Sequence, residues 1–366
     1  MNPDFWRRRR VFITGHTGFK GSWLSIWLQM LGAEVHGYSL PPPGRPNLYE
    51  IAQVGRSMSS TEGDIRDLQH LKASLTRSDA EIVFHLAAQP IVGLSYIAPV
   101  DTYSTNVLGT VNLLEAVRTI RRPCSIVCIT TDKCYENREL NHPFTEQDRL
   151  GGHDPYSNSK ACAELVCSSY RDSYFKYPNQ NAIPVSLATA RAGNVIGGGD
   201  FAVDRLIPDI LRGIERGETV FIRNPTAVRP WQHVLEPLRG YLMLAEKLHS
   251  HGADFAQPWN FGPELEDCKP VSWIVEEMER RWTQGTAWRP SLDTHPHEAQ
   301  TLRLSIEKSR QHLAWMPTLH LGQALDFVVD WHKAMKTGAD MKVVTMSQIA
   351  GYERRINPTS GASLAK

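Results

Sequence analysis

The chain has 366 residues, 41% of them hydrophobic, which is ordinary for a globular protein with a large core. Lys and Arg number 40 and Asp and Glu number 39, so the net charge of +1 gives no bulk attraction to nucleic acid or to an anionic membrane. No apolar stretch approaches the roughly 20 residues that a membrane span needs. The six cysteines lack the paired spacing of a zinc site, which predicts no metal and a reducing, cytoplasmic location.

Short apolar strand patterns alternate with helical patterns through the first half of the chain. The expected strands are rich in apolar and β-branched residues and cover 11–14, 35–38, 82–86, 125–130 and 185–190. The expected helices have apolar residues at helical spacing and cover 21–31, 107–117 and 156–170. This alternation predicts an α/β fold with a Rossmann-type, doubly wound parallel sheet.

The second half of the chain has a less regular pattern. After Arg191 the strict alternation ends, and we expect a smaller C-terminal α/β lobe that binds substrate. Past about residue 337 the helical pattern fades, and 358–366 is expected to be a loose tail.

A glycine-rich loop follows the first expected strand. Gly15, Gly18 and Gly21 are spaced G-x-x-G-x-x-G between that strand and the first expected helix. Glycine permits positive φ and a close approach of backbone to a diphosphate, and the free N–H groups at a helix start attract the same anion. A plain tight turn is the alternative, but the strand-turn-helix context favours a dinucleotide site.

Two further positions bear on which dinucleotide binds. Asp64 lies between the expected strands 35–38 and 82–86 and can accept a hydrogen bond from an adenine amino group, with a surface turn as the alternative. The second expected strand ends at 37–40 without an acidic residue to hold the ribose hydroxyls, and Arg45 in the next loop could meet a 2′-phosphate. The choice between NAD and NADP is open on these residues, and NAD is preferred.

Tyr156 and Lys160 open an expected helix with the spacing Tyr-x-x-x-Lys. Residues four apart lie on one helical face, roughly 6 Å apart at Cβ. A tyrosine is a poor base at its ordinary pKa of about 10, but a nearby ammonium favours the phenolate. The pair follows the expected strand 125–130, and ligands in such folds bind beyond the carboxyl ends of the strands. The pattern indicates a base for a hydroxyl proton, with a solvent-facing Tyr and Lys as the alternative.

Together these motifs resemble the extended short-chain dehydrogenase/reductase family, over about residues 9 to 335. The matching segments are 14–21, 63–65, 85–88, 106–110, the Tyr156/Lys160 pair and the motif from Arg191 to Asn194. The resemblance implies an NAD cofactor held by Gly15, His16, Gly18, Phe19, Gly21, Asp64, Ile65, Leu86, Ala87, Ala88, Tyr156 and Lys160. It implies an NAD-binding Rossmann domain at 1–190 that also receives a segment near 228–262, a lobe mainly for the nucleotide sugar at 191–335, and a tail of unknown role at 336–366.

Within the family, five segments are most similar to the dehydratases that act on CDP-glucose: 15–24, 131–135, 154–160, 193–200 and 229–234. In the implied reaction Tyr156 removes the proton of the sugar 4-hydroxyl while hydride passes to NAD. Water is then eliminated across C5 and C6, and the hydride returns to C6. By the same resemblance, Thr131 polarises the 4-oxygen and Asp132 protonates the leaving 6-hydroxyl.

Three other residues receive roles from the resemblance. Lys133 stands where related dehydratases have Glu; it can take the C5 proton only if its pKa is depressed, and otherwise it stabilises the enolate or pairs with Asp132. Asn194 and Arg229 match residues that hold the nucleotide diphosphate, for which guanidinium is well suited. The resemblance also implies a homodimer in which helices near 100–120 and 156–172 form a four-helix bundle with those of the partner copy.

Other functions remain open on the sequence. One is a nucleotide-sugar epimerase, or a dehydratase of GDP-mannose or dTDP-glucose; the Asp132-Lys133 pair favours dehydration, because the epimerases lack such a pair. Another is a non-catalytic dinucleotide-binding protein with the same fold, which the presence of Tyr156 and Lys160 disfavours.

Overall fold

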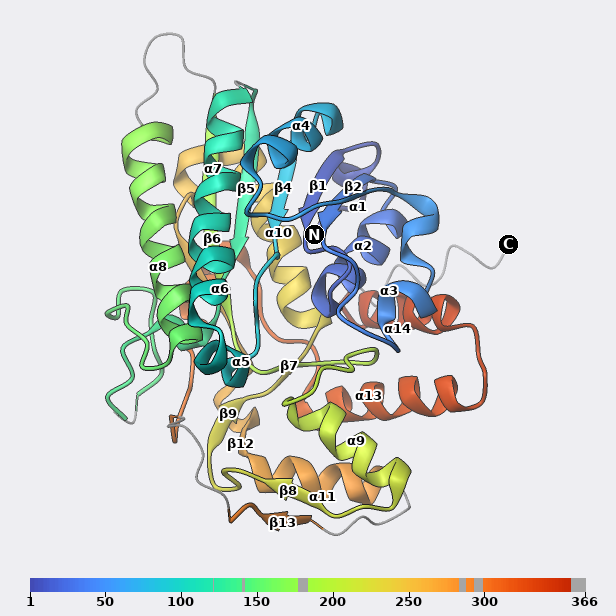
Figure 1. The fold of residues 1–366 in the computed structure, drawn as a ribbon. Helices are drawn as coiled ribbons and strands as arrows, with labels where there is room; N and C mark the ends of the chain where they lie inside the picture. Colours follow the sequence, from blue (N-terminus) through green and yellow to red (C-terminus); the bar gives the residue numbers. More distant parts are fainter. Residues whose placement is uncertain (121, 140–141, 177–183, 283–287, 293–298, 357–366) are drawn as a thin grey trace.

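The structure is a computed structural model that describes residues 1–120, 122–139, 142–176, 184–282, 288–292 and 299–356. Its centre is a parallel seven-stranded sheet with the order β11-β6-β5-β4-β1-β2-β3 (Figure 1). The strands are Arg10–Thr14 (β1), Glu34–Ser39 (β2), Ser59–Glu62 (β3), Ile82–His85 (β4), Cys124–Ile129 (β5), Val185–Ala192 (β6) and Pro258–Phe261 (β11). The predicted doubly wound parallel sheet is confirmed, and the strand order changes direction between β1 and β4, where such sheets bind ligands.

Helices cover both faces of this sheet, so its inner strands are apolar on both sides. In β1, Val11 and Ile13 enter one core and Phe12 enters the other. The first core is covered by Phe19–Met30 (α2) and Leu235–His251 (α10). The second is covered by the helices Leu68–Ser78 (α4), Gly109–Ile120 (α7) and Pro155–Tyr170 (α8). Shorter helices are Pro3–Trp6 (α1), Leu48–Ile51 (α3), Val92–Ile97 (α5) and Pro99–Tyr103 (α6).

A second, smaller lobe lies beyond the carboxyl ends of the strands, at the bottom of Figure 1. Its helices are Leu206–Arg216 (α9), Val271–Trp282 (α11) and Leu321–Lys336 (α13), whereas Glu307–Leu313 (α12) packs on α10 and β11 of the large sheet. Its strands form two-stranded pairs and are Val195–Ile196 (β7), Val220–Ile222 (β8), Val228–Pro230 (β9), Gln232–His233 (β10), Cys268–Pro270 (β12) and Trp288–Pro290 (β13). Between β10 and β12 the chain returns to the large sheet, where α10 packs on one face and β11 pairs with β6.

The C-terminal region contains a helix that the sequence pattern did not predict. Residues Met341–Ile356 form α14, whose inward positions are Met341, Thr345, Ile349 and Tyr352. A threonine interrupts this stripe, and its spacing gives a weak apolar pattern, which explains the failed prediction. The expected loose tail at 358–366 lies outside the described residues.

Helix α14 is held against the first lobe by buried contacts. The ring of Tyr352 meets the Trp27 ring edge-on at 5.8 Å, and its hydroxyl donates to a Glu236 carboxylate oxygen at 2.7 Å. The same carboxylate accepts the backbone N–H of Leu319 at 2.7 Å. This helix is therefore part of the packed structure. None of the helices in the described ranges is both long and apolar enough to cross a membrane.

Candidate active site

The glycine-rich loop between β1 and α2 packs directly against the loop that follows β4. Gly15 has φ +77°, and a Cβ there would lie 2.7 Å from the backbone nitrogen of Ala87. A Cβ at Gly21 would lie 2.1 Å from the Gly15 oxygen, so the first turn of α2 rests on the loop itself. Gly18 is the N-cap of α2 and offers no side chain to the first N–H groups of the helix. The loop therefore fits a dinucleotide diphosphate, which backbone N–H groups would bind.

His16 lies in this loop at the end of β2. Its ring is buried over Gly37, where a Cβ would lie 2.4 Å from the ring, and its Nε2 is 2.7 Å from the Ser60 hydroxyl. Burial lowers the pKa of His16 to about 4, so the imidazole is neutral at physiological pH. The neutral His16 ring thus lies beside the second strand, whose end at 37–40 lacks the acidic residue that would hold the ribose hydroxyls.

The other predicted cofactor residues lie around the same loop. The Phe19 ring packs on Gly197, where a Cβ would lie 3.0 Å from the ring tip. In the segment 86–88, which is partly buried, the Ala87 N–H donates to the Thr14 hydroxyl at 3.2 Å. These contacts bring the loops after β1, β4 and β6 together at one edge of the sheet.

Asp64 and Ile65 closely follow β3. The carboxylate of Asp64 accepts the Arg66 guanidinium at 2.6 Å, and this hydrogen bond lowers the pKa of Asp64. Ile65 is buried against Gly109, where a Cβ would lie 2.7 Å from its side chain. The predicted adenine contact would require Asp64 to bind both the ligand and Arg66.

Helix α8 begins with a cap that places Tyr156 in its first turn. The Asp154 carboxylate accepts the backbone N–H of Ser157 at 2.9 Å, and a proline occupies the first helical position. One turn later, the Lys160 ammonium donates to the carbonyl oxygen of Ile129 at 3.2 Å. Ile129 is the last residue of β5, so Lys160 joins the predicted catalytic helix to the end of that strand.

Burial sets the proton affinity of both predicted groups. It raises the pKa of Tyr156 to about 12, against the opposing effects of the Thr131 hydroxyl and the Arg205 cation. It lowers the pKa of Lys160 to about 8. The phenol is therefore protonated at neutral pH in the protein alone, and acts as a base only when bound ligands lower its pKa.

Asp132 follows β5 and is almost fully buried, with 1% of its surface exposed. The Thr131 hydroxyl donates to its Oδ1 at 3.0 Å, whereas Oδ2 has no hydrogen-bond partner among the described residues. Burial raises the pKa of Asp132, although Lys133 and Arg229 oppose the shift. A buried carboxyl group with a raised pKa can hold a proton and donate it.

The structure brings four more predicted residues into the surroundings of this carboxyl group. The Thr131 hydroxyl acts on the pKa of Tyr156, and the charges of Lys133 and Arg229 act on the pKa of Asp132. No ion pair within 4.0 Å joins Lys133 to Asp132, both of which are described, so the structural ion-pair alternative is not observed. The guanidinium of Arg229 is buried and donates to the carbonyl oxygen of Val228 at 3.0 Å.

Asn194 begins the passage from the sheet to the second lobe. Its backbone has φ +33°, and its carbonyl oxygen accepts the Gln232 N–H at 3.2 Å, beside the pairing of β7 with β10. Its neighbour Gly193 lies directly against Asp132, because a Cβ at Gly193 would lie 1.8 Å from Oδ2. The loop that follows β6 therefore packs directly against the carboxyl group of Asp132, the predicted acid.

Sequence reasoning missed two cations near this site. Burial, Arg205 and Lys160 together lower the pKa of Lys20 to about 7, and Asp132 also acts on its charge. Arg205 pairs with Asp200 at 2.8 Å. Lys20 could have been noticed in the sequence, because it is a charged residue within the glycine-rich loop. Arg205 has no such signal, because only the packing of the second lobe brings it to the site.

Comparison with known proteins identifies the family of this chain. A family model described as GDP-mannose 4,6 dehydratase matches residues 12–326. The CDP-glucose 4,6-dehydratase of Salmonella typhimurium (strain LT2) is 51% identical over 352 residues, which cover 96% of this chain and 98% of the relative. The GDP-mannose 4,6-dehydratase of Vibrio cholerae is 27% identical over 85% of this chain and 90% of its own length.

A solved structure has the same fold. The dTDP-glucose 4,6-dehydratase of Bacillus anthracis, in complex with NAD, matches with a TM-score of 0.75 at 22% identity, covering 91% of this chain and 99% of that chain. The resemblance found in the sequence motifs is confirmed by the family match and by the long match to the Salmonella relative. The chain belongs to the GDP-mannose 4,6-dehydratase family, within the extended short-chain dehydrogenases/reductases.

Proposed function

We propose that this chain catalyses the NAD-dependent 4,6-dehydration of CDP-D-glucose, giving CDP-4-dehydro-6-deoxy-D-glucose and water. The observation that carries the proposal is the buried Asp132 carboxyl, with a raised pKa and a free Oδ2, next to Thr131 and Tyr156. An elimination needs such an acid, and an epimerisation does not. The choice of CDP-glucose is supported by the 51% identity to the Salmonella enzyme.

The residues of the chain divide the reaction between them. The glycine-rich loop would hold NAD, which would supply the acceptor for the C4 hydride and the source of the hydride returned to C6. Tyr156 takes the proton of the 4-hydroxyl. In the substrate complex the single hydroxyl proton of Thr131 turns from Asp132 Oδ1 to the 4-oxygen, and Thr131 donates a hydrogen bond there. The resulting ketone acidifies the C5 proton. A base takes this proton and returns it to C5 once the hydride has reached C6, while Lys133 supplies a cation that stabilises the enolate. Asp132 donates its proton to the 6-hydroxyl, which leaves as water.

The direct test incubates the chain with CDP-D-glucose and NAD and follows the product by mass spectrometry and proton NMR. We expect loss of one water and a 4-keto-6-deoxy sugar. GDP-mannose and dTDP-glucose serve as matched substrates under the same conditions. Turnover of one of these without turnover of CDP-glucose would overturn the proposed choice of substrate but not the proposed dehydratase activity. No product from any of the three would overturn the proposed activity.

The cofactor of the reaction is NAD. The glycine-rich loop fits its diphosphate, and the dTDP-glucose 4,6-dehydratase from Bacillus anthracis was solved in complex with NAD. Arg45, which could have met the 2′-phosphate of NADP, is ion-paired with Glu50 at 2.9 Å. Identifying the nucleotide released from the denatured protein tests this choice. Six free cysteines further support the expected cytoplasmic location, which cell fractionation tests.

We also propose a homodimer through a four-helix bundle. Exposed apolar side chains lie along helices α5 and α6, the π-helical turn Ser104–Leu108 and α8, namely Ile97, Val100, Leu108 and Leu165. Apolar surface of this kind on neighbouring helices suits an interface between two copies. Light scattering should give twice the mass of the chain, and Leu165→Glu should shift it to that of the monomer. A wild-type chain that stays monomeric at micromolar concentration would overturn this arrangement.

A further inference from the structure

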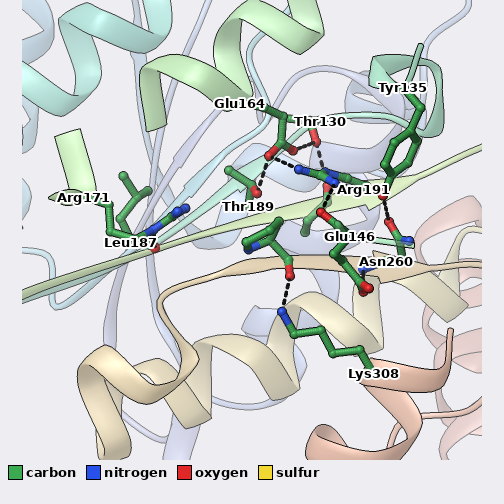
Figure 2. Close-up of polar contacts among 12 residues, drawn as sticks. Thr130, Tyr135, Glu146, Glu164, Arg171, Leu187, Thr189, Arg191, Asn260 and Lys308 are labelled. Carbon is green, nitrogen blue, oxygen red and sulfur yellow. Dashed lines mark hydrogen bonds and ion pairs between the residues drawn. The ribbon is translucent and has the colours of Figure 1, made fainter. Parts of the chain in front are cut away.

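A buried ion pair joins α8 to β6 behind the candidate active site. The Arg191 guanidinium lies 2.8 Å from the Glu164 carboxylate, and each side chain is 3% exposed (Figure 2). The Thr130 hydroxyl donates to Glu164 Oε1 at 2.5 Å, and the Thr189 hydroxyl donates to Oε2 at 2.7 Å. Burial opposes the charge of Glu164, but Arg191 and both hydroxyls outweigh burial and lower the pKa of Glu164. The pair is therefore charged, and both carboxylate oxygens of Glu164 are hydrogen-bonded, whereas Arg191 Nε has no hydrogen-bond partner among the described residues.

The same pair holds both ends of the turn that contains Asp132. Thr130, at the start, is bound by Glu164. At the other end, the Arg191 guanidinium donates to the Tyr135 hydroxyl at 2.9 Å and lies 4.9 Å from the centre of its ring. The Tyr135 hydroxyl in turn donates to the Asn260 side chain of β11 at 2.7 Å, as Figure 2 shows. The turn 131–134 thus lies between two residues fixed by one ion pair.

Glu164 also belongs to the helix that supplies the proposed base. It follows Lys160 by one turn and Tyr156 by two, so the three side chains lie on one helical face. Lys160 binds the carbonyl oxygen of Ile129, and Glu164 binds the hydroxyl of Thr130. Two consecutive residues at the end of β5 are therefore tied to two consecutive turns of α8.

We propose that Glu164 and Arg191 are positioning residues that fix the Asp132 turn relative to Tyr156. The inference rests on the proposed function, in which the acid and the base act on neighbouring parts of one hexose. A displacement of about 1 Å between such groups lowers a rate by about 100-fold. Neither residue contacts the sugar in this assignment; each acts through Thr130 or Tyr135.

The test compares Thr130→Val with Thr130→Ser. Valine keeps the volume of threonine but removes the hydroxyl bound to Glu164, whereas serine keeps the hydroxyl. We expect Thr130→Val to lower kcat for CDP-glucose about 10- to 100-fold, with KM within about threefold of wild type. Bound NADH should accumulate, because elimination depends on the placement of Asp132. Thr130→Ser should stay within about threefold of wild type in kcat.

A second measurement does not depend on turnover. Hydrogen–deuterium exchange should be at least about tenfold faster in the peptide containing 131–135 of Thr130→Val than in wild type or Thr130→Ser. Equal exchange in all three proteins would overturn the positioning role, as would wild-type kcat in Thr130→Val. A purely structural role would lower the thermal midpoint of Thr130→Val without raising its NADH. Absence of turnover in the wild-type chain would instead overturn the proposed function, and the exchange result would still decide this inference.

Discussion

Replacing Tyr156 with Phe is expected to reduce kcat for CDP-glucose by about 10³-fold or more while NAD still binds. The phenol oxygen is the proposed acceptor of the 4-hydroxyl proton, and removal of a general base costs about 10² to 10⁴ in rate. The ring itself remains, so the packing at the start of α8 is preserved. Because the first chemical step is lost, no NADH should form in a single turnover.

Stopped-flow absorbance of NADH and calorimetric binding of NAD check this expectation. Tyr174→Phe is the matched control, because Tyr174 is 51% exposed and lies past the far end of the same helix. That variant should keep wild-type kcat. Near-normal turnover by Tyr156→Phe would reject Tyr156 as the base and, with it, the proposed arrangement of the site.

Replacing Asp132 with Asn should separate the two halves of the reaction. Asparagine has the same shape, but it cannot deliver an acidic proton to the 6-hydroxyl from its buried position. The first hydride transfer should survive and elimination should fall by about 10² to 10⁴. NADH should therefore build up on the enzyme, and the keto-deoxy product should nearly disappear.

Gly193→Ala provides an independent route to the same result. A Cβ at this position would lie 1.8 Å from Asp132 Oδ2, so the methyl group must displace the acid. Gly351→Ala in α14, where a Cβ would meet no atom closer than 3.8 Å, is the control. Elimination at the wild-type rate in Asp132→Asn, or loss of its first hydride transfer, would contradict the assigned role.

Most of the large sheet could be predicted from the sequence because its signals are local. The apolar run at 11–13 and the glycines that follow define a buried strand and a helix start within a dozen residues. Helix α14 could not be predicted in this way, since Thr345 lies on its buried face and Glu236, a partner of Tyr352, is far away in the sequence.

In the candidate site, too, residues in local motifs could be predicted from the sequence, and residues placed by tertiary contacts could not. Tyr156 and Asp132 stand in short motifs that can be recognised without coordinates. The steric role of Gly193 and the electrostatic effect of Arg205 arise from residues about 50 to 60 positions away. The pairing of β5 with β6 brings Gly193 to Asp132, and the packing of the second lobe brings Arg205 toward Tyr156. The pKa of Tyr156 also depends on burial, which a motif does not encode.

The return of the chain to the large sheet through α10 and β11 has a practical consequence. Because β11 pairs with β6, and α10 packs on the same core as α2, the first half of the sequence does not contain all of its own lobe, and the missing part lies within the sequence of the second lobe. A fragment that stops at residue 190 would expose the unpaired edge of β6 and bare an apolar face, the features that promote aggregation. The two lobes are interleaved rather than modular, so neither can be exchanged between enzymes by cutting the gene at one point.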